Sequence, residues 1–533
     1  MKVFKSILLY LLIAIGLLAA AVMVCCVILM LSPKTKILGY QYVSYKKSYV
    51  RDITASESAT AQAININSNR MKINIVPTTN NYIKVVYSPG MSGFVKAKNS
   101  KLSLDVRFEQ NQQFTGVDDG TSYKTLNIIA TEPEGLLFLS SSYMTIYVPV
   151  TYEYSVINAA NGRGGINYTA ISSSKEIKVS RLYLKTTTAD IDIIAPNADV
   201  YYISTTTGDL KFNNNNRDID ANITYRTNTG SFETTSVING AVSVESEAKS
   251  VGPNISIKKV LGSFNFESPS GNVVIGEIGD MSSGESSNLT VKASNASFKI
   301  NKIYGYTYVQ PFKDNVDNID FKINDLYNTN SGGFQSFFES GKGNITIGTL
   351  RGYSQFKTST GNVKVTNAYE SMYIYTYSGA INVTFNTAAN PNDGLGGMQI
   401  DTTESNITVK NIKCKVDISV NSNKFTRSRN INLEYMEVDV DSVIDAYTHH
   451  VNIETKIGNK YTFITSAPKK DVDIASTVST GIVSEMLTTD SDYSLQYAEK
   501  TVYRVGYSKG QNYDGRIFVN TTGKVSVQGS EEY

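Results

Sequence analysis

The stretch TSTGNVKV at residues 358–365 is followed eighteen positions later by TYSGAINV at residues 376–383. Each copy has small polar residues, a glycine, one further residue, and then two apolar residues separated by a polar one. Gly361 and Gly379 tolerate backbone angles that other residues avoid, and the alternating tail is typical of a half-buried strand. The phrase therefore predicts a corner of the chain followed by a short β-strand.

The corner phrase recurs along most of the chain. The residue two positions after each corner is apolar, as with Ile345, Val363, Ile381 and Ile407. The spacing averages about 22 residues, which is a period typical of solenoid proteins. The predicted corners are Gly164, Ala189, Gly208, Gly230, Pro253, Gly271, Ala296, Asp317, Gly343, Gly361, Gly379, Ser405, Arg429, His449 and Lys470.

Asparagine or aspartate directly follows most of these corners, and stacked asparagine amides can hydrogen-bond one another along a cross-β direction. We therefore expect an asparagine ladder along the corners and an inward stack of the apolar residues. Val363 and Ile381 should then be buried neighbours on successive parallel strands, with Asn362 beside Ala380.

A second strand precedes each corner, as in YSQFKTST at 353–360. Two or three short strands per repeat favour an all-β parallel β-helix, or β-solenoid, over a barrel or a sandwich. We predict a transmembrane anchor at 1–32, a stalk at 33–60, an N-terminal β region at 61–160, solenoid repeats at 161–475 and a C-terminal β region at 476–533. In the last region GRIFV (515–519) and GKVSV (523–527) are expected to form an antiparallel capping hairpin.

The N-terminal stretch Ser6–Leu31 runs 26 residues without a charge. A bilayer core needs about 20 such residues in a helix. A cleaved signal peptide is the competing interpretation, because Lys2 and Lys5 precede the stretch, but its apolar core is usually about 7–15 residues long. The length favours an uncleaved, single-pass anchor.

The orientation of this anchor rests on the size of the domain that follows it. Lys34, Lys36, Lys46, Lys47 and Arg51 place more positive charge after the span than before it, which alone would argue for the opposite topology. Long domains, however, translocate largely regardless of such charge. We expect a cytoplasmic N-terminus and an extracellular remainder.

Composition limits the function further. The net charge of +2 is far from the basic excess of nucleic-acid-binding proteins, so a nucleic-acid partner is not expected. Cys25 and Cys26 lie in the apolar span, and Cys414 alone cannot form a disulfide within the remaining chain.

Few residues suggest chemistry. His449 and His450 are adjacent and are the only histidines, so they cannot supply a spaced catalytic or metal set, and we expect both to be solvent-exposed corner residues. Cys414 has no identifiable base and is expected to be a small, buried or half-buried residue. The sequence predicts no enzyme, no cofactor, and no catalytic or metal residues.

Carboxylates are the remaining chemical option. Asp190, Asp192, Asp209, Asp218 and Asp220 fall on neighbouring predicted coils and would form an acidic strip. Such a strip could hold Ca²⁺ or serve catalysis, although aspartate is common at turns and the spacing of calcium-binding repeats is absent. Exposed aromatic residues offer contact area for glycans or proteins, or act only as strand formers. The candidates are Tyr201, Tyr202, Tyr373, Tyr375 and Tyr377.

The repeats resemble those of bacterial surface proteins with the "putative adhesin" domain. That family combines an N-terminal membrane span with repeated phrases of the form T-x-S/T-G, then Asp, Asn or Ser, then two apolar residues one position apart. The matching phrases are TTTGDLKF (205–212), TNTGSFET (227–234), SPSGNVVI (268–275) and the two opening stretches. The resemblance covers about 164–475; Arg429, His449 and Lys470 depart from its pattern. It implies a β-solenoid at the cell surface and assigns no catalytic residues.

We therefore expect a membrane-anchored bacterial surface protein, an adhesin that presents a repetitive β-solenoid face to a glycan, a protein or the cell envelope. The first alternative is a carbohydrate-active enzyme on a β-helix, either a lyase or a glycosidase. The second is an envelope-stress accessory protein that acts through membrane partners.

Overall fold

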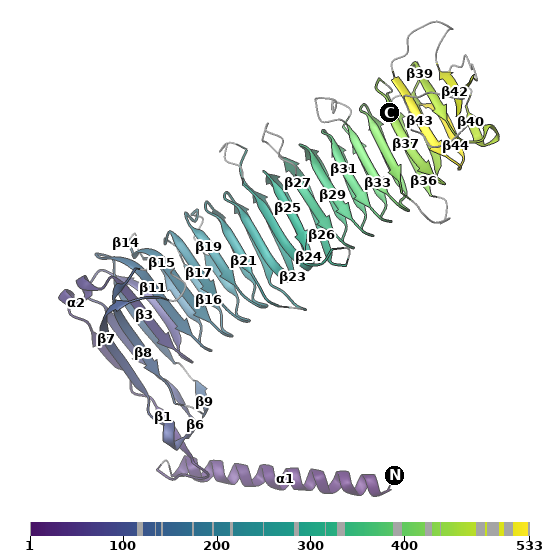
Figure 1. The fold of residues 1–533 in the computed structure, drawn as a ribbon. Helices are drawn as coiled ribbons and strands as arrows, with labels where there is room; N and C mark the ends of the chain where they lie inside the picture. The colour runs from purple at the N-terminus through teal and green to yellow at the C-terminus, as the bar shows by residue number, and fades with distance from the viewer. Residues whose placement is uncertain are drawn as a thin grey trace. The chain divides into compact units, whose positions relative to one another are not determined.

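The computed structural model divides into two compact units, Met1–Ser236 and Val237–Tyr533, which are described separately. It describes residues 2–32, 34–114, 121–133, 135–139, 142–172, 175–194, 197–213, 217–248, 250–281, 287–314, 316–327, 336–386, 397–421, 429–437, 439–475, 485–487, 500–505 and 515–530. Both units are predominantly β (Figure 1).

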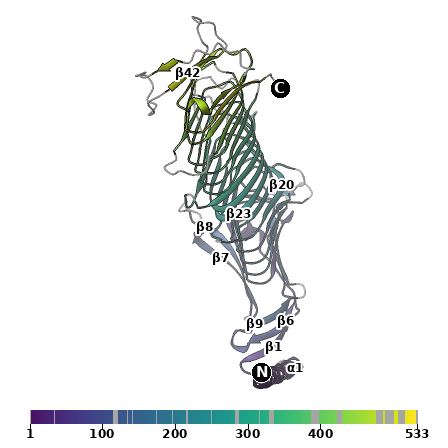
Figure 2. The same cartoon turned by 90° about the vertical axis from the view of Figure 1, so that its right-hand side faces the viewer.

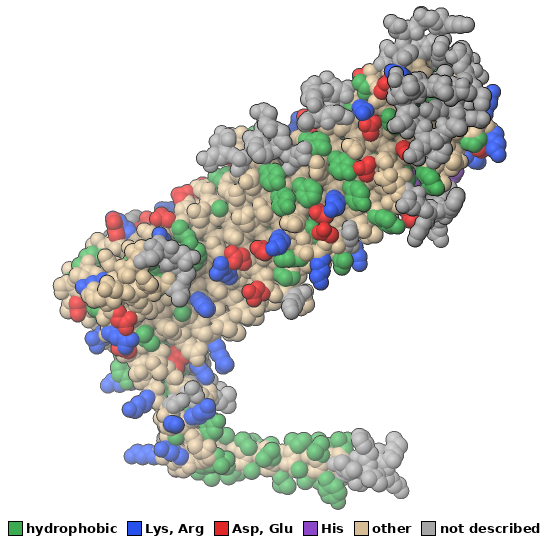
Figure 3. Space-filling model, in the orientation of Figure 1, with side chains coloured by type: hydrophobic (Ala, Val, Ile, Leu, Met, Phe, Trp, Pro, Cys, Tyr) green, Lys and Arg blue, Asp and Glu red, His purple; other side chains and the backbone are tan. Residues whose placement is uncertain are grey.

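Unit 1 begins with the apolar helix α1 (Lys2–Leu31). Its segment Tyr10–Leu31 is 22 residues long, has a mean hydropathy of 3.1 and is mostly exposed, with Leu29 buried. Figure 3 shows this helix covered by hydrophobic side chains along its described length. The helix is therefore long and apolar enough to be a membrane span or a signal sequence.

Short strands make up most of the remainder of unit 1, together with helix α2 (Ala55–Thr60) and the 3₁₀ turn η1 (Ala97–Asn99). Helix α2 starts at Thr54, whose hydroxyl accepts the Glu57 backbone N–H while Glu57 bonds back to the Thr54 N–H, forming a capping box. The strands are β1 (Tyr40–Tyr45), β2 (Tyr49–Asp52), β3 (Ala63–Ser68), β4 (Lys72–Thr78), β5 (Lys84–Ser88), β6 (Met91–Lys96), β7 (Ser103–Gln112), β8 (Tyr123–Thr131), β9 (Gly135–Leu139), β10 (Tyr143–Pro149), β11 (Glu153–Asn161), β12 (Ile166–Thr169), β13 (Ile171–Ser172), β14 (Lys175–Glu176), β15 (Lys178–Thr186), β16 (Ile191–Ile194), β17 (Val200–Ser204), β18 (Leu210–Asn213), β19 (Asn222–Arg226) and β20 (Phe232–Ile238).

Two parallel ladders organise unit 1. The first runs β8–β3–β11–β15–β17–β19, and the second runs β10–β4–β12–β16–β18–β20. Strands β7 and β5 pair antiparallel with β8 and β10 respectively, β2 pairs antiparallel with β5, β13 pairs antiparallel with β14, and β1, β6 and β9 form a separate antiparallel sheet. We call one strand of the first ladder, the corner after it and the following strand of the second ladder a repeat.

Unit 2 has the same organisation and a 3₁₀ turn, η2 (Lys469–Asp471). Its strands are β21 (Val242–Glu245), β22 (Asn254–Val260), β23 (Phe264–Ile278), β24 (Leu289–Tyr304), β25 (Thr307–Pro311), β26 (Asn318–Tyr327), β27 (Ser336–Ser340), β28 (Ile345–Arg351), β29 (Ser354–Thr358), β30 (Val363–Ala368), β31 (Met372–Thr376), β32 (Ile381–Phe385), β33 (Met398–Thr402), β34 (Ile407–Ile412), β35 (Val416–Val420), β36 (Asn430–Met436), β37 (Ser442–Tyr447), β38 (His450–Lys456), β39 (Tyr461–Thr465), β40 (Val472–Ile474), β41 (Glu485–Leu487), β42 (Lys500–Val505), β43 (Gly515–Thr521) and β44 (Val525–Ser530).

The first ladder of unit 2 includes β27–β29–β31–β33–β35–β37, and the second includes β26–β28–β30–β32–β34–β36–β38, all parallel. Figure 2 shows the strands of this unit lying side by side in rows. Val363 pairs with Ile381 and both are fully buried, while the Ala380 N–H donates to Asn362 Oδ1 at 2.8 Å. The predicted parallel neighbours are therefore confirmed.

Close approach between neighbouring repeats explains the corner glycines. A Cβ atom added at Gly361 would lie 1.9 Å from the carbonyl oxygen of Gly343, and one at Gly379 would lie 1.9 Å from that of Gly361. Neither glycine has a positive φ, so the expected reason, unusual backbone angles, is wrong. Glycine is present because the backbone of the preceding repeat occupies the space of a side chain.

A buried threonine hydroxyl, three residues before each of these corners, forms a hydrogen bond with the corner glycine. Thr358 Oγ1 donates to the carbonyl oxygen of Gly361 at 2.8 Å, and the Gly379 N–H donates to Thr376 Oγ1 at 3.1 Å. The two hydroxyl oxygens lie 2.9 Å apart, which joins one repeat to the next. The threonine of the phrase thus satisfies corner groups that would otherwise be buried without partners.

The predicted asparagine ladder exists in a modified form. The side-chain oxygen of the residue after a corner accepts the backbone N–H of the equivalent residue in the next repeat, so aspartate serves as well as asparagine. An additional bond between amides joins Asn362 Nδ2 to Asn344 Oδ1 at 3.0 Å. The backbone bonds join Asp190 to Asp209, Asp209 to Ser231, Asp320 to Asn344, Asn344 to Asn362, Asn362 to Ala380, and Asn406 to Asn430.

One predicted corner is displaced by two residues. Phe321 pairs with Phe298 on one side and with Ile345 on the other, so Ile319, not Asp317, occupies the corner. A strand's side chains alternate with a period of two, so a shift by two leaves the apolar pattern of this segment unchanged. Only the pairing with neighbours fixes the corner.

The expected C-terminal hairpin is wrong. Strand β43 pairs parallel with both β37 and β39, and β44 pairs parallel with both β38 and β40. The segment NTTGKVSV at 520–527 is itself a corner phrase, and a Cβ at Gly523 would lie 2.3 Å from the carbonyl oxygen of His449. This repeat lies between the repeats at 442–456 and 461–474, so the predicted corner Lys470 does not stack directly on His449.

Because the backbones touch at the corner, we predict that an added methyl group at Gly361 lowers the stability of the repeats around it. Gly361→Ala should destabilise the surrounding repeats by about 2–3 kcal/mol, because the obstructing atoms belong to a paired backbone. Thr360→Ala, at the exposed neighbouring position, should change stability by no more than about 0.5 kcal/mol. Native-state hydrogen exchange of peptides from 340–385 in the detergent-solubilised chain measures both. Equal protection in the two variants would contradict the contact.

Candidate ligand-binding surface

The outer face of the first ladder in unit 1 carries its polar and aromatic residues in rows. Strands of this ladder pair in register, so residues at equivalent positions lie side by side across successive strands. One row, which we call the tyrosine row, consists of Asn127, Asn65, Asn158, Tyr183, Tyr202 and Thr224. The next, which we call the cation row, consists of Ile129, Asn67, Ala160, Lys185, Ser204 and Arg226.

Asparagines at one end of the tyrosine row hold one another in place. Asn158 Nδ2 donates to Asn65 Oδ1 at 2.8 Å, and Asn65 Nδ2 donates to Asn127 Oδ1 at 2.6 Å. Asn127 Nδ2 in turn donates to Gln112 Oε1 at 3.0 Å. This chain of amides fixes the orientation of Asn158 at the edge of the aromatic pair.

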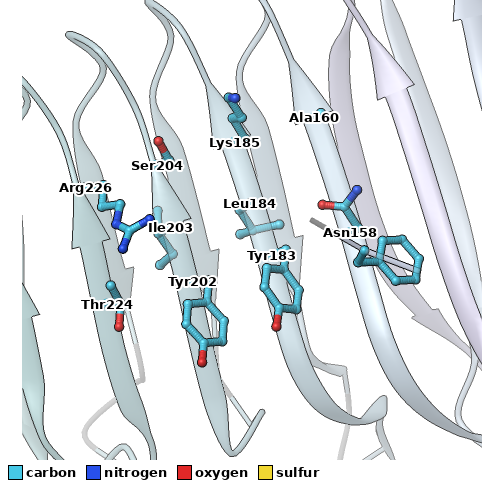
Figure 4. A pocket seen from close by; sticks show the side chains of 11 residues that line it. Asn158, Ala160, Tyr183, Leu184, Lys185, Tyr202, Ile203, Ser204, Thr224 and Arg226 are labelled. Atoms are coloured by element: carbon cyan, nitrogen blue, oxygen red, sulfur yellow. The ribbon is translucent and has the colours of Figure 1, made fainter. Parts of the chain in front are cut away.

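Tyr183 and Tyr202 form a stacked pair next to these amides. Their ring centroids are 4.7 Å apart and their planes differ by 8°. Tyr183 packs against a buried cluster that contains Phe114 and Val156, while Tyr202 is 37% exposed. Figure 4 shows the two rings on adjacent strands with their hydroxyl groups at the same end. The pair is thus anchored on one side and accessible on the other.

A hollow of about 550 Å³ lies over both rows. This volume is within the range of about 300–1,000 Å³ found for ligand sites. Lys185 and Arg226 line it together with the tyrosines, and none of its lining residues is acidic. The hollow therefore combines aromatic surface, hydroxyl and amide groups, and positive charge. Its full lining is Phe114, Asn158, Ala160, Tyr183, Leu184, Lys185, Tyr202, Ile203, Ser204, Thr224 and Arg226.

Of the sequence-based candidates, Tyr202 alone belongs to this surface. The other side chains could have been found by aligning the repeats on their corners. Tyr183 and Tyr202 each lie six residues before a corner, and Lys185 and Arg226 each lie four residues before one. The corner phrase itself covers mainly the residues after each corner, whereas the residues that form this surface lie before it.

The remaining tyrosine candidates have other environments. Tyr201 is fully buried, and its hydroxyl accepts the Ala198 N–H at 2.8 Å. In unit 2, the Tyr373 hydroxyl donates to Asp401 Oδ2 at 2.6 Å, while Tyr375 and Tyr377 are exposed. Tyr201 therefore contributes to the core of unit 1 and to no surface.

Two members of the predicted acidic strip are neighbours in the structure. Asp190 and Asp209 are adjacent in the corner ladder, where each carboxylate accepts a backbone N–H. Asp192 lies on the outer face of β16, and its position is in register with that of Lys211 on the neighbouring strand β18. Asp218 and Asp220 are exposed and lie in the segment before β19. Among the residues that the structure describes, no group of three or more histidine, cysteine or acidic side chains could hold a metal ion.

Cys414 and the histidines are structural in their surroundings. Cys414 is fully buried, as expected, and burial raises the pKa of its thiol to about 12, which disfavours the nucleophilic thiolate. His450 Nδ1 accepts the Lys524 N–H at 2.9 Å and so replaces the corner asparagine. His449 is only 2% exposed, which contradicts its expected exposure, because the corner position faces the neighbouring repeat.

His449 predicts an acid-sensitive fold. Burial is the main cause that lowers the pKa of His449 below the usual 6.5. The charges of Arg429 and His450 lower it further, and the nearby backbone of Ser405 and Ala446 opposes this shift. The unfolded chain therefore binds the proton more readily, so stability is complete above about pH 6.5 and falls below it, by at most about 1.4 kcal/mol per pH unit.

Thermal melts followed by circular dichroism at pH 7.5 and 5.0 measure this loss. The wild-type chain should lose more stability on acidification than His449→Gln, whatever the effect of that substitution at pH 7.5. The same acid-induced loss in both proteins would assign the pH dependence to other groups.

No family model matches the sequence, and no curated protein does. Among solved structures, a "putative cell adhesion protein" from Clostridium sporogenes ATCC 15579 is similar at 14% identity, over 50% of this chain and 98% of that chain, with a TM-score of 0.22. At this level the similarity carries no argument about fold or function, so the resemblance to the adhesin family remains a prediction.

Proposed function

We propose that this chain is a membrane-anchored surface protein of the adhesin type, in which a parallel β-solenoid binds carbohydrate in the hollow described above, which we call the groove. The observation that carries the proposal is the groove over Tyr183 and Tyr202, with the fixed amide of Asn158 beside it. Aromatic rings give sugars an apolar surface, and oriented amide and hydroxyl groups give them hydrogen-bond partners.

The parallel ladders support the solenoid. In the repeats from β29 to β34, strands of one ladder alternate along the sequence with strands of the other, and each pairs with the equivalent strand 18 or 26 residues away. Buried residues occupy the inner positions of both ladders. Coils of one helical winding would produce this pairing, whereas a sandwich built from hairpins would pair its strands antiparallel.

Helix α1 supports the anchor. Its apolar segment exceeds the usual core of a signal peptide, and a cytoplasmic N-terminus with Lys2 and Lys5 would leave the β units outside the cell. A groove on the outer face of the sheet would then meet extracellular polymers.

Binding without catalysis fits the residues of the groove. Its lining residues include no carboxylate, histidine or cysteine that could act as a general acid, a general base or a nucleophile. Asp190 and Asp209, the carboxylates considered for a lyase or glycosidase, accept backbone N–H groups at the corners. We therefore favour an adhesin over a carbohydrate-active enzyme.

Glycan-array binding of the full-length chain in nanodiscs tests this proposal. The wild-type chain should bind a subset of glycans, and Tyr202→Ala should weaken that binding about tenfold, equivalent to about 1.4 kcal/mol. Tyr377→Ala removes a tyrosine of unit 2 that is more exposed than Tyr202, and this change should leave glycan binding unchanged. Binding that is insensitive to Tyr202→Ala would contradict a role for the groove.

A further inference from the structure

We infer that the segment between α1 and β1 docks onto the bilayer surface, where lysines around a tight turn bind anionic phospholipid headgroups and Leu38 enters the interface. This inference rests on α1 as the membrane anchor of the proposed function and does not involve the groove. The turn runs from Ile37 to Tyr40, and we call it the membrane-proximal turn.

Positive charge is concentrated directly after α1. Residues 33–101 contain 11 lysine and arginine residues and two acidic ones, whereas residues 102–533 contain 37 and 46. The net charge of +2 for the whole chain is thus the sum of a basic stretch next to the apolar helix and an acidic remainder. Figure 3 shows lysine and arginine side chains gathered where the chain leaves α1. A basic stretch beside a membrane span attracts anionic lipid headgroups.

The membrane-proximal turn exposes a leucine where leucine is disfavoured. Ile37 and Tyr40 exchange two backbone hydrogen bonds of 2.9 Å and so enclose a two-residue turn. Its central residues, Leu38 and Gly39, have φ angles of 50° and 81°. Two positive values are typical of a type I′ turn, in which asparagine followed by glycine is usual and a bulky residue is strained. Leu38 is nevertheless 92% exposed, so packing within the chain does not account for it.

Leu38 is close enough to the helix to reach the bilayer surface. Leu31, the last residue of α1, precedes it by seven residues, which span at most about 25 Å. The Thr35 N–H donates to the Ser32 carbonyl oxygen at 2.8 Å, and this turn shortens the path. Tyr40 is 41% exposed, and tyrosine is enriched at membrane interfaces. An exposed leucine beside a tyrosine and several lysines is the composition of a segment that lies in the interface.

The fold adds a cation from a distant part of the sequence to this turn. The Ala97 N–H, at the start of η1, donates to the carbonyl oxygen of Gly39 at 2.8 Å, which holds η1 against the turn. Lys98 of η1 therefore lies near the segment that carries Lys34 and Lys36. We call these three residues the docking lysines. All three are exposed, and none forms an ion pair with a residue that the structure describes.

The surroundings of the turn supply few carboxylates. Strands β1, β6 and β9 contain no aspartate or glutamate, and neither do residues 32–39 and 97–101. Lys96, at the end of β6, has an interaction of its own and is not one of the docking lysines. Asp52 lies on β2 in register with Lys84 of β5, and Glu57 belongs to the capping box of α2. Glu134, which directly precedes β9 in sequence, lies outside the described residues. Lipid phosphates can therefore accept charge-assisted hydrogen bonds from the docking lysines.

An introduced tryptophan reports the contact, because the chain contains no tryptophan of its own. The full-length Leu38→Trp chain is incorporated into nanodiscs of phosphatidylcholine and phosphatidylglycerol, in which one lipid or the other is brominated and so quenches tryptophan fluorescence. Brominated phosphatidylglycerol should quench at least about twice as strongly as the same fraction of brominated phosphatidylcholine. Tyr377→Trp, at an exposed position of unit 2, should be quenched by neither lipid.

The docking lysines are tested in the Leu38→Trp chain. Replacing all three with glutamine should make quenching by the two lipids equal. Salt at about 0.5 M should have the same effect, because it screens the attraction between exposed charges. The matched control removes three exposed lysines from the second ladder of unit 2 and should leave the preference unchanged. Its substitutions are Lys299→Gln, Lys322→Gln and Lys364→Gln.

Each outcome decides a different claim. Equal quenching of the Leu38→Trp chain by the two lipids would overturn the preference for anionic headgroups, and so would a preference lost equally in the lysine control. A preference that survives replacement of the docking lysines would overturn their role. An incorporated chain that neither lipid quenches would overturn the docking of the turn and leave the anchor intact. A chain that does not incorporate into nanodiscs would contradict the anchor, and this inference with it, whereas the groove is judged separately by Tyr202→Ala.

Discussion

The close contact between corner peptides of neighbouring repeats is the constraint on which the rest of each unit depends. The space for a Cβ atom at Gly361 is taken by the carbonyl oxygen of Gly343, and Gly379 stands in the same relation to Gly361. This contact aligns the flanking strands, so that buried residues such as Val363 and Ile381 stack. Hydroxyl groups and carboxamides at the corner then satisfy the peptide groups that the contact buries.

The outer face takes its properties from the same alignment. Once the register is fixed, residues about 20 positions apart in sequence become neighbours across strands, and each outer position becomes a row. Tyr183 and Tyr202 form an aromatic pair for this reason, and Lys185 lies one row away. An outer surface on this fold is thus a set of equivalent positions in adjacent repeats.

Sequence alone predicted most of the repeat geometry and little of the binding surface. The corner phrase identified the apolar stack correctly because steric and burial requirements repeat at every corner. The phrase failed where the local sequence fits two arrangements equally well. A shift by two residues leaves the apolar pattern around Ile319 unchanged, so the corner was placed at Asp317. The spacing of GRIFV and GKVSV fits either a hairpin or a repeat. Lys185 and Arg226 were missed because a solvent-exposed residue leaves no periodic trace. That the two residues occupy the same row is visible only when the strands are aligned.

Cysteine cross-linking across β32 and β34 tests the parallel, in-register stacking most directly. Asn382 faces Thr408, and Thr384 faces Lys410, so a cysteine pair at either matched position lies within the reach of a disulfide. The account predicts that both matched pairs cross-link in the full-length, detergent-solubilised chain, and that the crossed pair Asn382→Cys with Lys410→Cys does not. Cross-linking of the crossed pair, with the matched pairs remaining reduced, would show antiparallel strands and contradict the stacking of repeats.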